Sequence, residues 1–127
     1  MLFGFIRRHK ALRRIREANS RVEFAAAIEK AKALNVEQGK ISKAIEKGKD
    51  NAVKTLSSVE NHREFVEAQN LINLFGVSDE RQAAALKKGA KKTLNSIKSC
   101  RSTRDYKELM VLAGDFHIPS KEINQAK

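Results

Sequence analysis

The amino-acid sequence predicts an all-α fold, a short α-solenoid of helix-pair repeats with a 41-residue period and about six helices. Two observations lead to this prediction. A pentapeptide at residues 20–24 returns without a gap at 61–65 and at 102–106, as Ser-Arg-Val-Glu-Phe, Asn-His-Arg-Glu-Phe and Ser-Thr-Arg-Asp-Tyr. The composition is rich in Ala, Lys, Glu and Leu and holds a single proline, which favours helix almost throughout.

Each copy of the pentapeptide has the pattern of a helix start. A cap-forming Ser or Asn stands first, a carboxylate stands three positions later, and an aromatic residue follows. This is the pattern of a capping box followed by the first buried side chain of a helix. The first helix of each pair is therefore expected after residues 20, 61 and 102, and the carboxylates Glu23, Glu64 and Asp105 are assigned to capping.

The second helix of each pair follows after a short linker. The predicted helices, residues 21–35 and 38–58, are separated by a linker of only two or three residues, so they are expected to be antiparallel neighbours. Gly76 is predicted to end the helix that starts at residue 62, in a left-handed conformation. Gly48 and Gly89 lie in mid-helix at the same phase of the repeat, which predicts that a neighbouring helix passes too close for a Cβ.

The length of 127 residues predicts one domain. Its expected parts are an N-terminal capping helix (1–19), repeat 1 (20–60), repeat 2 (61–101) and a partial repeat 3 (102–127). Residues 1–19 match the second helix of a pair, and their apolar start is interpreted as a cap on the open end of the stack. A partner-binding or membrane-surface anchor is the alternative.

The last predicted helix differs from the others. Residues 109–114 are apolar on nearly every side, which is typical of a helix that is buried on every side. The segment from Pro119 onward is too short to cover it, so either the chain folds back or a second copy or another partner covers this helix. The predicted protein-interface residues, for a homodimer or hetero-complex, are Leu109, Val111, Phe3 and Phe5.

The net charge of +11 favours anionic partners. The second helices of the pairs carry it, with +5 in residues 1–19, +1 in 37–60 and +5 in 78–101, whereas the first helices together carry −1. Glu46 and Asp50 interrupt the basic stripe in its middle. A solvated face that only confers solubility is the alternative to binding. The predicted anion-binding residues are Arg7, Arg8, Lys10, Arg13, Arg14, Lys47, Lys54, Lys87, Lys88, Lys91 and Lys92.

The sequence shows no pattern typical of an enzyme, a cofactor site or a metal site. His9, His62 and His117 lie in three different elements, without a carboxylate or cysteine at ligand spacing. No phosphate-binding loop or nucleophile motif is present. Five of the seven aromatic residues fall at predicted core positions, which leaves no row of rings for stacking bases. The pattern favours backbone-dominated nucleic-acid binding, with strong salt dependence.

The predicted function is a non-enzymatic binding module that presents a basic face to nucleic acid, DNA or RNA, or to an acidic protein. The alternative is a protein-interaction adaptor or inhibitor that uses the apolar C-terminal helix and the N-terminal segment. Cys100 is alone, so no intramolecular disulfide is expected and a reducing, cytoplasmic compartment is favoured, with a secreted effector left open. No apolar run is long enough to span a bilayer, and the N-terminus lacks the order of a secretory signal.

Overall fold

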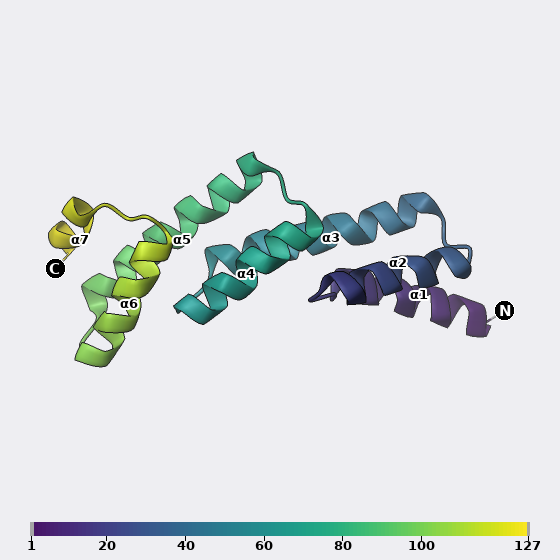
Figure 1. The fold of residues 1–127 in the computed structure, drawn as a ribbon, viewed down its shortest axis with the longest axis horizontal. Helices are drawn as coiled ribbons and strands as arrows, with labels where there is room; N and C mark the ends of the chain where they lie inside the picture. Colours follow the sequence, from purple (N-terminus) through teal and green to yellow (C-terminus); the bar gives the residue numbers. More distant parts are fainter. Residues whose placement is uncertain (1, 127) are drawn as a thin grey trace.

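A computed structural model describes the backbone of residues 2–126 and the side chains of residues 4–125. This part of the chain forms seven helices and no strand (Figure 1). The all-α prediction is confirmed, with one helix more than the approximate six because the segment after Pro119 is itself helical. The helices are α1 (Leu2–Arg16), α2 (Arg21–Ala33), α3 (Gln38–Ser57), α4 (His62–Phe75), α5 (Asp79–Ser99), α6 (Thr103–Asp115) and α7 (Ser120–Ala126).

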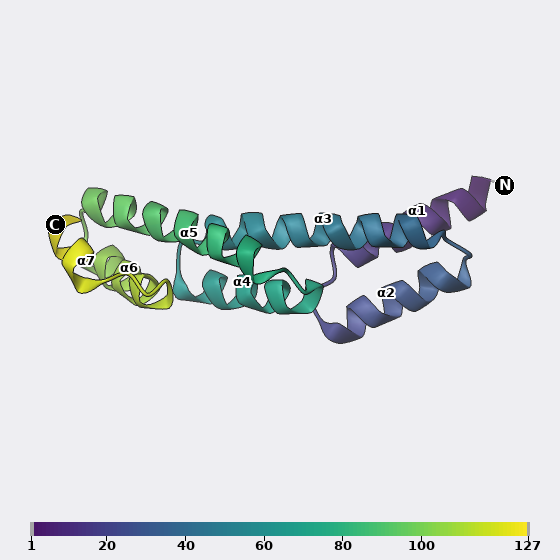
Figure 2. The same ribbon diagram turned by 90° about the horizontal axis from the view of Figure 1, so that it is seen from above.

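The molecule is elongated, with its two ends at opposite extremes (Figure 1). Helices α1, α3 and α5 follow one another along one side, and α2, α4 and α6 lie along the other (Figure 2). Contacts within each row support this arrangement, because α3 packs against both α1 and α5 and α4 packs against α6. We call the first row the α1–α3–α5 side.

The close helix pairs differ from those expected. Helix α2 packs closely on α1, α4 on α3 and α6 on α5, so each helix of the α1–α3–α5 side packs on the helix that follows it. Residues 21–35 and 38–58 are expected to be antiparallel neighbours; in the structure the two helices share a core cluster, but α2 packs most extensively on α1 and α3 on α4. Helices α2 and α3 diverge from their short linker (Figure 2), where Asn35 adopts a left-handed backbone conformation that turns the chain.

The predicted helix starts are confirmed by their capping hydrogen bonds. Helices α2, α4 and α6 begin at residues 21, 62 and 103, each 41 residues after the one before. The side-chain oxygens of Ser20, Asn61 and Ser102 accept hydrogen bonds from the backbone N–H groups three positions on. The carboxylates of Glu23 and Glu64 also accept from the backbone N–H groups of Asn19 and Glu60, both at 2.9 Å.

The ends of the same helices also match. The residues at positive φ are Asn35 (59°), Gly76 (66°) and His117 (56°), which lie 41 residues apart. The prediction for Gly76 is confirmed. After each of them, an apolar residue donates its backbone N–H to the carbonyl five positions back, which is the 6→1 bond of a Schellman motif. These bonds join Val36 to Ala31, Val77 to Ile72 and Ile118 to Ala113.

Replacing His117 with glycine is expected to raise the free energy of unfolding by up to about 1 kcal/mol, because an L side chain is strained in the left-handed region. The side chain is exposed, so little packing is lost. Gly76→Ala at the equivalent position is the reverse control and is expected to lower stability. Urea denaturation measures both, and a His117→Gly variant less stable than the original chain would contradict this account of the turn.

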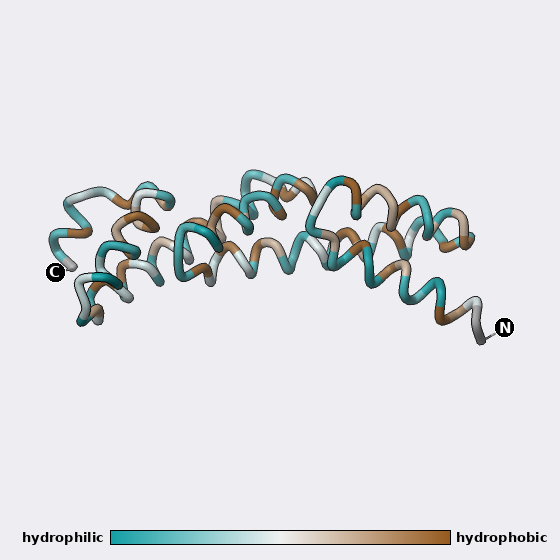
Figure 3. Tube along the Cα trace, turned by 60° about the horizontal axis from the view of Figure 1, so that its bottom comes forward, coloured by the Kyte–Doolittle hydropathy of each residue, from teal (hydrophilic) through white to brown (hydrophobic). Residues whose placement is uncertain are grey.

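The core consists of two clusters that follow the chain. The first joins α1, α2 and α3 through Ala11, Ile15, Ala27, Ala31, Ile41 and Ala44. The second and larger cluster extends from α3 to α7 and includes Leu56, Ile72, Phe75, Leu112, Phe116 and Ile123. Phe24 and Ile45 are half-buried and pack against both clusters. Hydrophobic residues alternate with hydrophilic ones along the helices (Figure 3), and no helix of the described chain is long and apolar enough to cross a membrane.

Gly48 and Gly89 are closely approached by a neighbouring element, as their equivalent positions in the repeat predict. The nearest atoms, however, belong to an aromatic ring. A Cβ on Gly48 would collide with the ring of Phe75, and a Cβ on Gly89 would collide with the ring of Phe116. Each ring also meets a second ring edge to face: Phe24 with Phe75 at 5.3 Å between centroids, and Phe65 with Phe116 at 5.0 Å. The same ring-on-glycine contact therefore occurs twice, 41 residues apart.

The expectation that residues 109–114 are buried on every side is wrong. Leu112 and Ala113 are buried, but Val111 is 54% exposed and Leu109 is half-buried against the larger cluster. Successive helical residues point in different directions, so the α6 residues that face α5 and α4 leave Val111 outside. The described C-terminal segment does not cover the outer face of α6. Helix α7 packs on α5 instead, and its Ile123 is buried there.

Candidate anion-binding site

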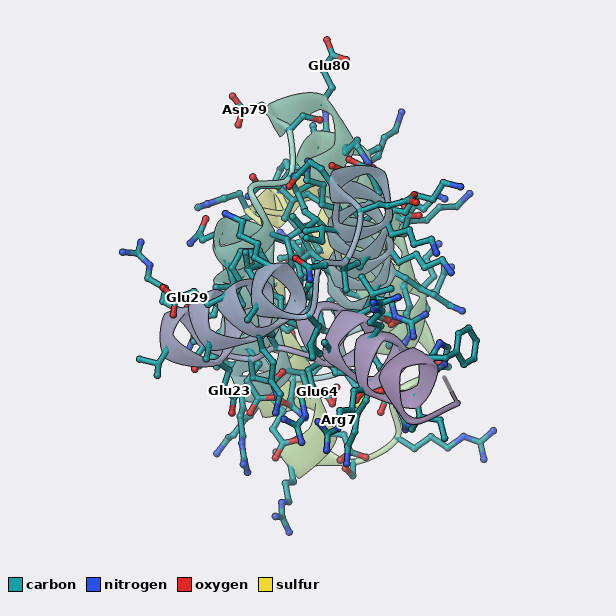
Figure 4. The ribbon with its side chains drawn as sticks, turned by 90° about the vertical axis from the view of Figure 1, so that its right-hand side faces the viewer. Arg7, Glu23, Glu29, Glu64, Asp79 and Glu80 are labelled. Atoms are coloured by element: carbon teal, nitrogen blue, oxygen red, sulfur yellow. The ribbon has the colours of Figure 1, made fainter. Side chains whose placement is uncertain are left out.

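The predicted anion-binding residues all belong to α1, α3 and α5. They therefore share the α1–α3–α5 side, and all are exposed except Lys92, which is half-buried. In the view along the molecule, side chains on the right end mostly in nitrogen, while the labelled acids lie to the left, above and below (Figure 4). Arg7 is an exception, because its side chain lies below, on the same side of the molecule as Glu23 and Glu64 (Figure 4).

Three of these cations already have partners within the protein. Arg8 Nε donates to the carbonyl of Leu34 at 3.0 Å, at the end of α2. Lys92 Nζ donates to the carbonyl of Ser58 at 2.8 Å, at the end of α3. Both stabilise helix C-termini, which attract cations. Arg13 pairs with Glu17 at 3.0 Å, one turn further along α1.

The acids in the middle of the basic stripe are neutralised by a residue that the sequence did not indicate. Arg81, at the start of α5, pairs with Asp50 and with Glu46, the latter at 3.3 Å between Nη1 and Oε2. Lys49 Nζ lies 3.2 Å from the other Glu46 oxygen. Lys49, with a smaller contribution from Arg81, holds the pKa of Glu46 below its usual range. These pairs tie α5 to α3 and remove the two carboxylates as free acids.

A basic groove lies between α1 and α3. Its volume is about 170 Å³, and Leu12 and Ala44 contribute its apolar lining. No acid lines it, and within the described residues none of its Lys or Arg side chains forms an ion pair. We call it the α1/α3 groove; its basic residues are His9, Arg16, Lys40, Lys43 and Lys47.

Sequence reasoning identified Lys47 in this groove and missed Arg16, Lys40 and Lys43. A signal was available for two of them, because positions 40, 43 and 47 lie on one face of a helix at three- and four-residue steps. Arg16 and His9 come from a different helix. Their approach to the lysines depends on how α1 packs against α3.

A second pocket adjoins the groove at the N-terminal half of α1. It has a volume of about 330 Å³, shares His9, Leu12 and Lys40 with the groove, and adds Phe5. The Phe5 side chain is 69% exposed, and its ring stacks on the His9 ring at 6.3 Å between centroids with 14° between planes. The remaining lining residues are Arg8, Asn35, Val36 and Glu37.

Residues 1–19 are predicted to form a capping helix, and the described side chains of α1 differ in burial. Ala11 and Ile15 are buried against α2 and α3, whereas Phe5 and Ile6 are exposed. Phe5 and Ile6 therefore do not cover the core. Phe3, a predicted interface residue, lies outside the described side chains.

The predicted interface residues do not form one surface. Phe5 is on α1, and Leu109 and Val111 are on α6 at the opposite end of the molecule (Figure 1). Leu109 is also half-buried against the core. The structure thus separates the two segments that the protein-interaction alternative uses.

The remaining histidine and cysteine contacts connect elements of the fold. His62 Nδ1 lies 2.7 Å from Asp115 Oδ2, which links α4 to α6. The Cys100 thiol donates to the carbonyl of Ser102 at 3.3 Å. In the part of the chain that the structure describes, no three His, Cys, Asp or Glu side chains are grouped so as to hold a metal ion.

Comparison with known proteins found no family model, no curated protein and no solved structure that matches the chain. The function is therefore inferred from the residues and geometry of the site.

Proposed function

We propose that this protein is a non-enzymatic binding module whose α1–α3–α5 side binds the phosphate backbone of nucleic acid. The observation that carries the proposal is the α1/α3 groove, where five basic side chains line one hollow without an acid. Phosphate oxygens are suitable partners for such a cluster, because ammonium and guanidinium groups form strong charge-assisted hydrogen bonds with them. The net charge of +11 attracts the same class of partner over a longer range.

The proposal includes a short α-solenoid of helix-pair repeats. Support comes from the equivalent starts of α2, α4 and α6, from the left-handed residues 41 positions apart, and from the repeated ring-on-glycine contact. In such an architecture equivalent helices line one long surface, which suits an extended ligand. A cytoplasmic location, where nucleic acid is accessible, accompanies this proposal.

The first test is binding of a labelled duplex and a labelled single strand, followed by fluorescence anisotropy at several salt concentrations. The affinity is expected to fall steeply with salt, with a log–log slope of about −0.7 to −0.9 for each phosphate contacted. The triple variant Lys54→Glu, Lys88→Glu, Lys91→Glu, on the α1–α3–α5 side, is expected to weaken binding strongly. All three residues are exposed, and none has an ion-pair partner within the described chain.

The matched control reverses three exposed charges on the other side, as Arg21→Glu, Arg104→Glu and Lys107→Glu. It changes the net charge by the same amount and is expected to weaken binding much less. Equal losses in the two variants would show that only net charge matters. No binding of either oligonucleotide at low salt would overturn the proposal.

A further inference from the structure

The α1/α3 groove has a counterpart between α3 and α5 with different electrostatics. Every lining residue of the α1/α3 groove has an equivalent 41 positions later that lines the second groove, and Lys54 joins them there. The equivalents, in chain order, are Asp50 for His9, Val53 for Leu12, Ser57 for Arg16, Arg81 for Lys40, Ala84 for Lys43, Ala85 for Ala44 and Lys88 for Lys47. The two grooves therefore share a framework and differ in the groups attached to it.

In the second groove the protein's own carboxylates pair with one of the basic residues. Arg81 pairs with Asp50 and Glu46, which stand one helical turn apart on α3. The equivalents of these two acids are His9 and Phe5 on α1, and the equivalent of Arg81 is Lys40. Lys40 has no ion-pair partner among the described residues. The Asp50 carboxylate thus marks a place where an anionic oxygen fits between two helices, and in the α1/α3 groove the equivalent residue is His9, with no carboxylate among the described lining residues.

An exposed aromatic ring stands beside His9. Phe5 replaces the second acid, is 69% exposed and is held against the His9 ring. Asn35 and Glu37 line the same adjoining pocket and offer hydrogen-bonding groups at its rim. Basic groups next to an exposed ring are the combination by which proteins bind single strands, through phosphate contacts and base stacking.

We propose that the junction of α1 and α3 binds one nucleotide of a single-stranded nucleic acid, with its phosphate in the α1/α3 groove and its base against Phe5. This inference rests on the proposed function. It specifies that the nucleic acid is single-stranded and that one nucleotide binds at the junction of α1 and α3. The base must leave a duplex stack to reach the ring, so single strands are bound more tightly than duplexes. The base identity matters little, because every base has a face that can stack.

The phosphate position is tested by removing three charges from the groove, as Lys40→Gln, Lys43→Gln and Lys47→Gln. Binding of labelled oligothymidine is expected to weaken by about tenfold or more, and the salt slope to fall by about 0.7, which is the contribution of one phosphate in a single strand. The matched control removes three charges from the same side outside the groove, as Lys54→Gln, Lys88→Gln and Lys91→Gln. Its loss is expected to be clearly smaller.

A single substitution at His9 tests the phosphate position more sharply. His9→Asp supplies the carboxylate that Asp50 supplies in the second groove, and it is expected to weaken oligothymidine binding by about tenfold. His9→Asn, which is neutral, is expected to retain most of the binding. Thermal denaturation of both variants checks that neither is unfolded. An ion pair between the new carboxylate of His9→Asp and Lys40 would leave that variant at least as stable as the original chain.

The base position is tested with Phe5→Leu, which keeps an apolar side chain but removes the ring. Its affinity for the single strand is expected to fall about fivefold or more, while its affinity for the duplex is unchanged. Phe5 is exposed, so folding is not at risk.

The outcomes separate this inference from the function on which it rests. If the unaltered protein binds neither oligonucleotide, both are overturned. If it binds but both lysine triples weaken binding equally, or Phe5→Leu binds the single strand as before, the nucleotide site is overturned and backbone binding stands. Displacement of oligothymidine by phosphatidylserine vesicles, at a lower phosphate concentration than by unlabelled oligothymidine, would assign the junction to a membrane surface and overturn the nucleotide site.

Discussion

Phe75→Ala is expected to lower the free energy of unfolding by about 3–5 kcal/mol. The side chain is 5% exposed at the end of α4, its ring lies over Gly48 of α3, and its edge-to-face partner is Phe24 of α2. Truncation therefore opens a cavity where three helices meet and removes an aromatic pair that contributes about 0.5–1.5 kcal/mol beyond its buried area. Urea denaturation followed by circular dichroism measures the change.

Two further variants make the Phe75 result interpretable. Val22→Ala removes an 80% exposed apolar side chain from α2 and is expected to change stability by less than about 0.5 kcal/mol. Phe75→Leu introduces the residue found at the equivalent position 34, and its effect is expected to lie between the other two. A loss below about 1 kcal/mol for Phe75→Ala would mean that the site collapses around the cavity, contrary to this packing account.

Gly89→Ala is expected to lower the free energy of unfolding by about 1–3 kcal/mol, although alanine is the better helix former. The new Cβ would collide with the buried Phe116 ring, and it would lie 3.2 Å from the carbonyl oxygen of Leu56. The ring cannot move freely, because Phe65 packs against it edge to face. The carbonyl belongs to the backbone of α3 and yields even less. The shift in denaturation midpoint measures the effect.

Gly39→Ala is the matched control. It lies near the start of α3, and nothing within 4 Å would meet its Cβ. Only helix propensity then changes, so the free energy of unfolding of this variant is expected to rise by up to about 1 kcal/mol. Combining Gly89→Ala with Phe116→Leu is expected to show non-additive stabilities, since a smaller residue makes room for the methyl group. Two glycine variants with the same sign would rule out the steric explanation for Gly89.

The helix boundaries and buried faces were predictable because their causes are local. The cap at Ser20 depends on a residue three positions away, and the turn at Gly76 depends on its own backbone freedom. Ile41 and Ile72, which lie on the apolar faces of their helices, are likewise buried. The same reasoning failed at Val111, where an apolar stretch was interpreted as buried on every side although its neighbours cover only part of α6.

The contacts that shape the candidate site could not be predicted from the sequence, because they join distant segments. Arg81 meets Asp50 and Glu46 across 31 and 35 positions, and His62 meets Asp115 across 53. Charge counting treated the two acids as interruptions of a binding face, whereas in the structure they are paired within the protein. Arg16 reaches the groove only through the packing of α1 on α3, which no spacing along the chain encodes.

The contact between each ring and its glycine has a consequence for how such a chain can change in length. Phe75 presents its ring to Gly48 as Phe116 presents its ring to Gly89, so the two junctions are interchangeable parts. Inserting or deleting a whole 41-residue segment would rejoin a ring to a glycine, whereas a shorter insertion within α3 or α4, between Gly48 and Phe75, would move the ring away from the glycine. A duplication of that length would conserve the contact, while the charges of the groove beside it stay free to diverge.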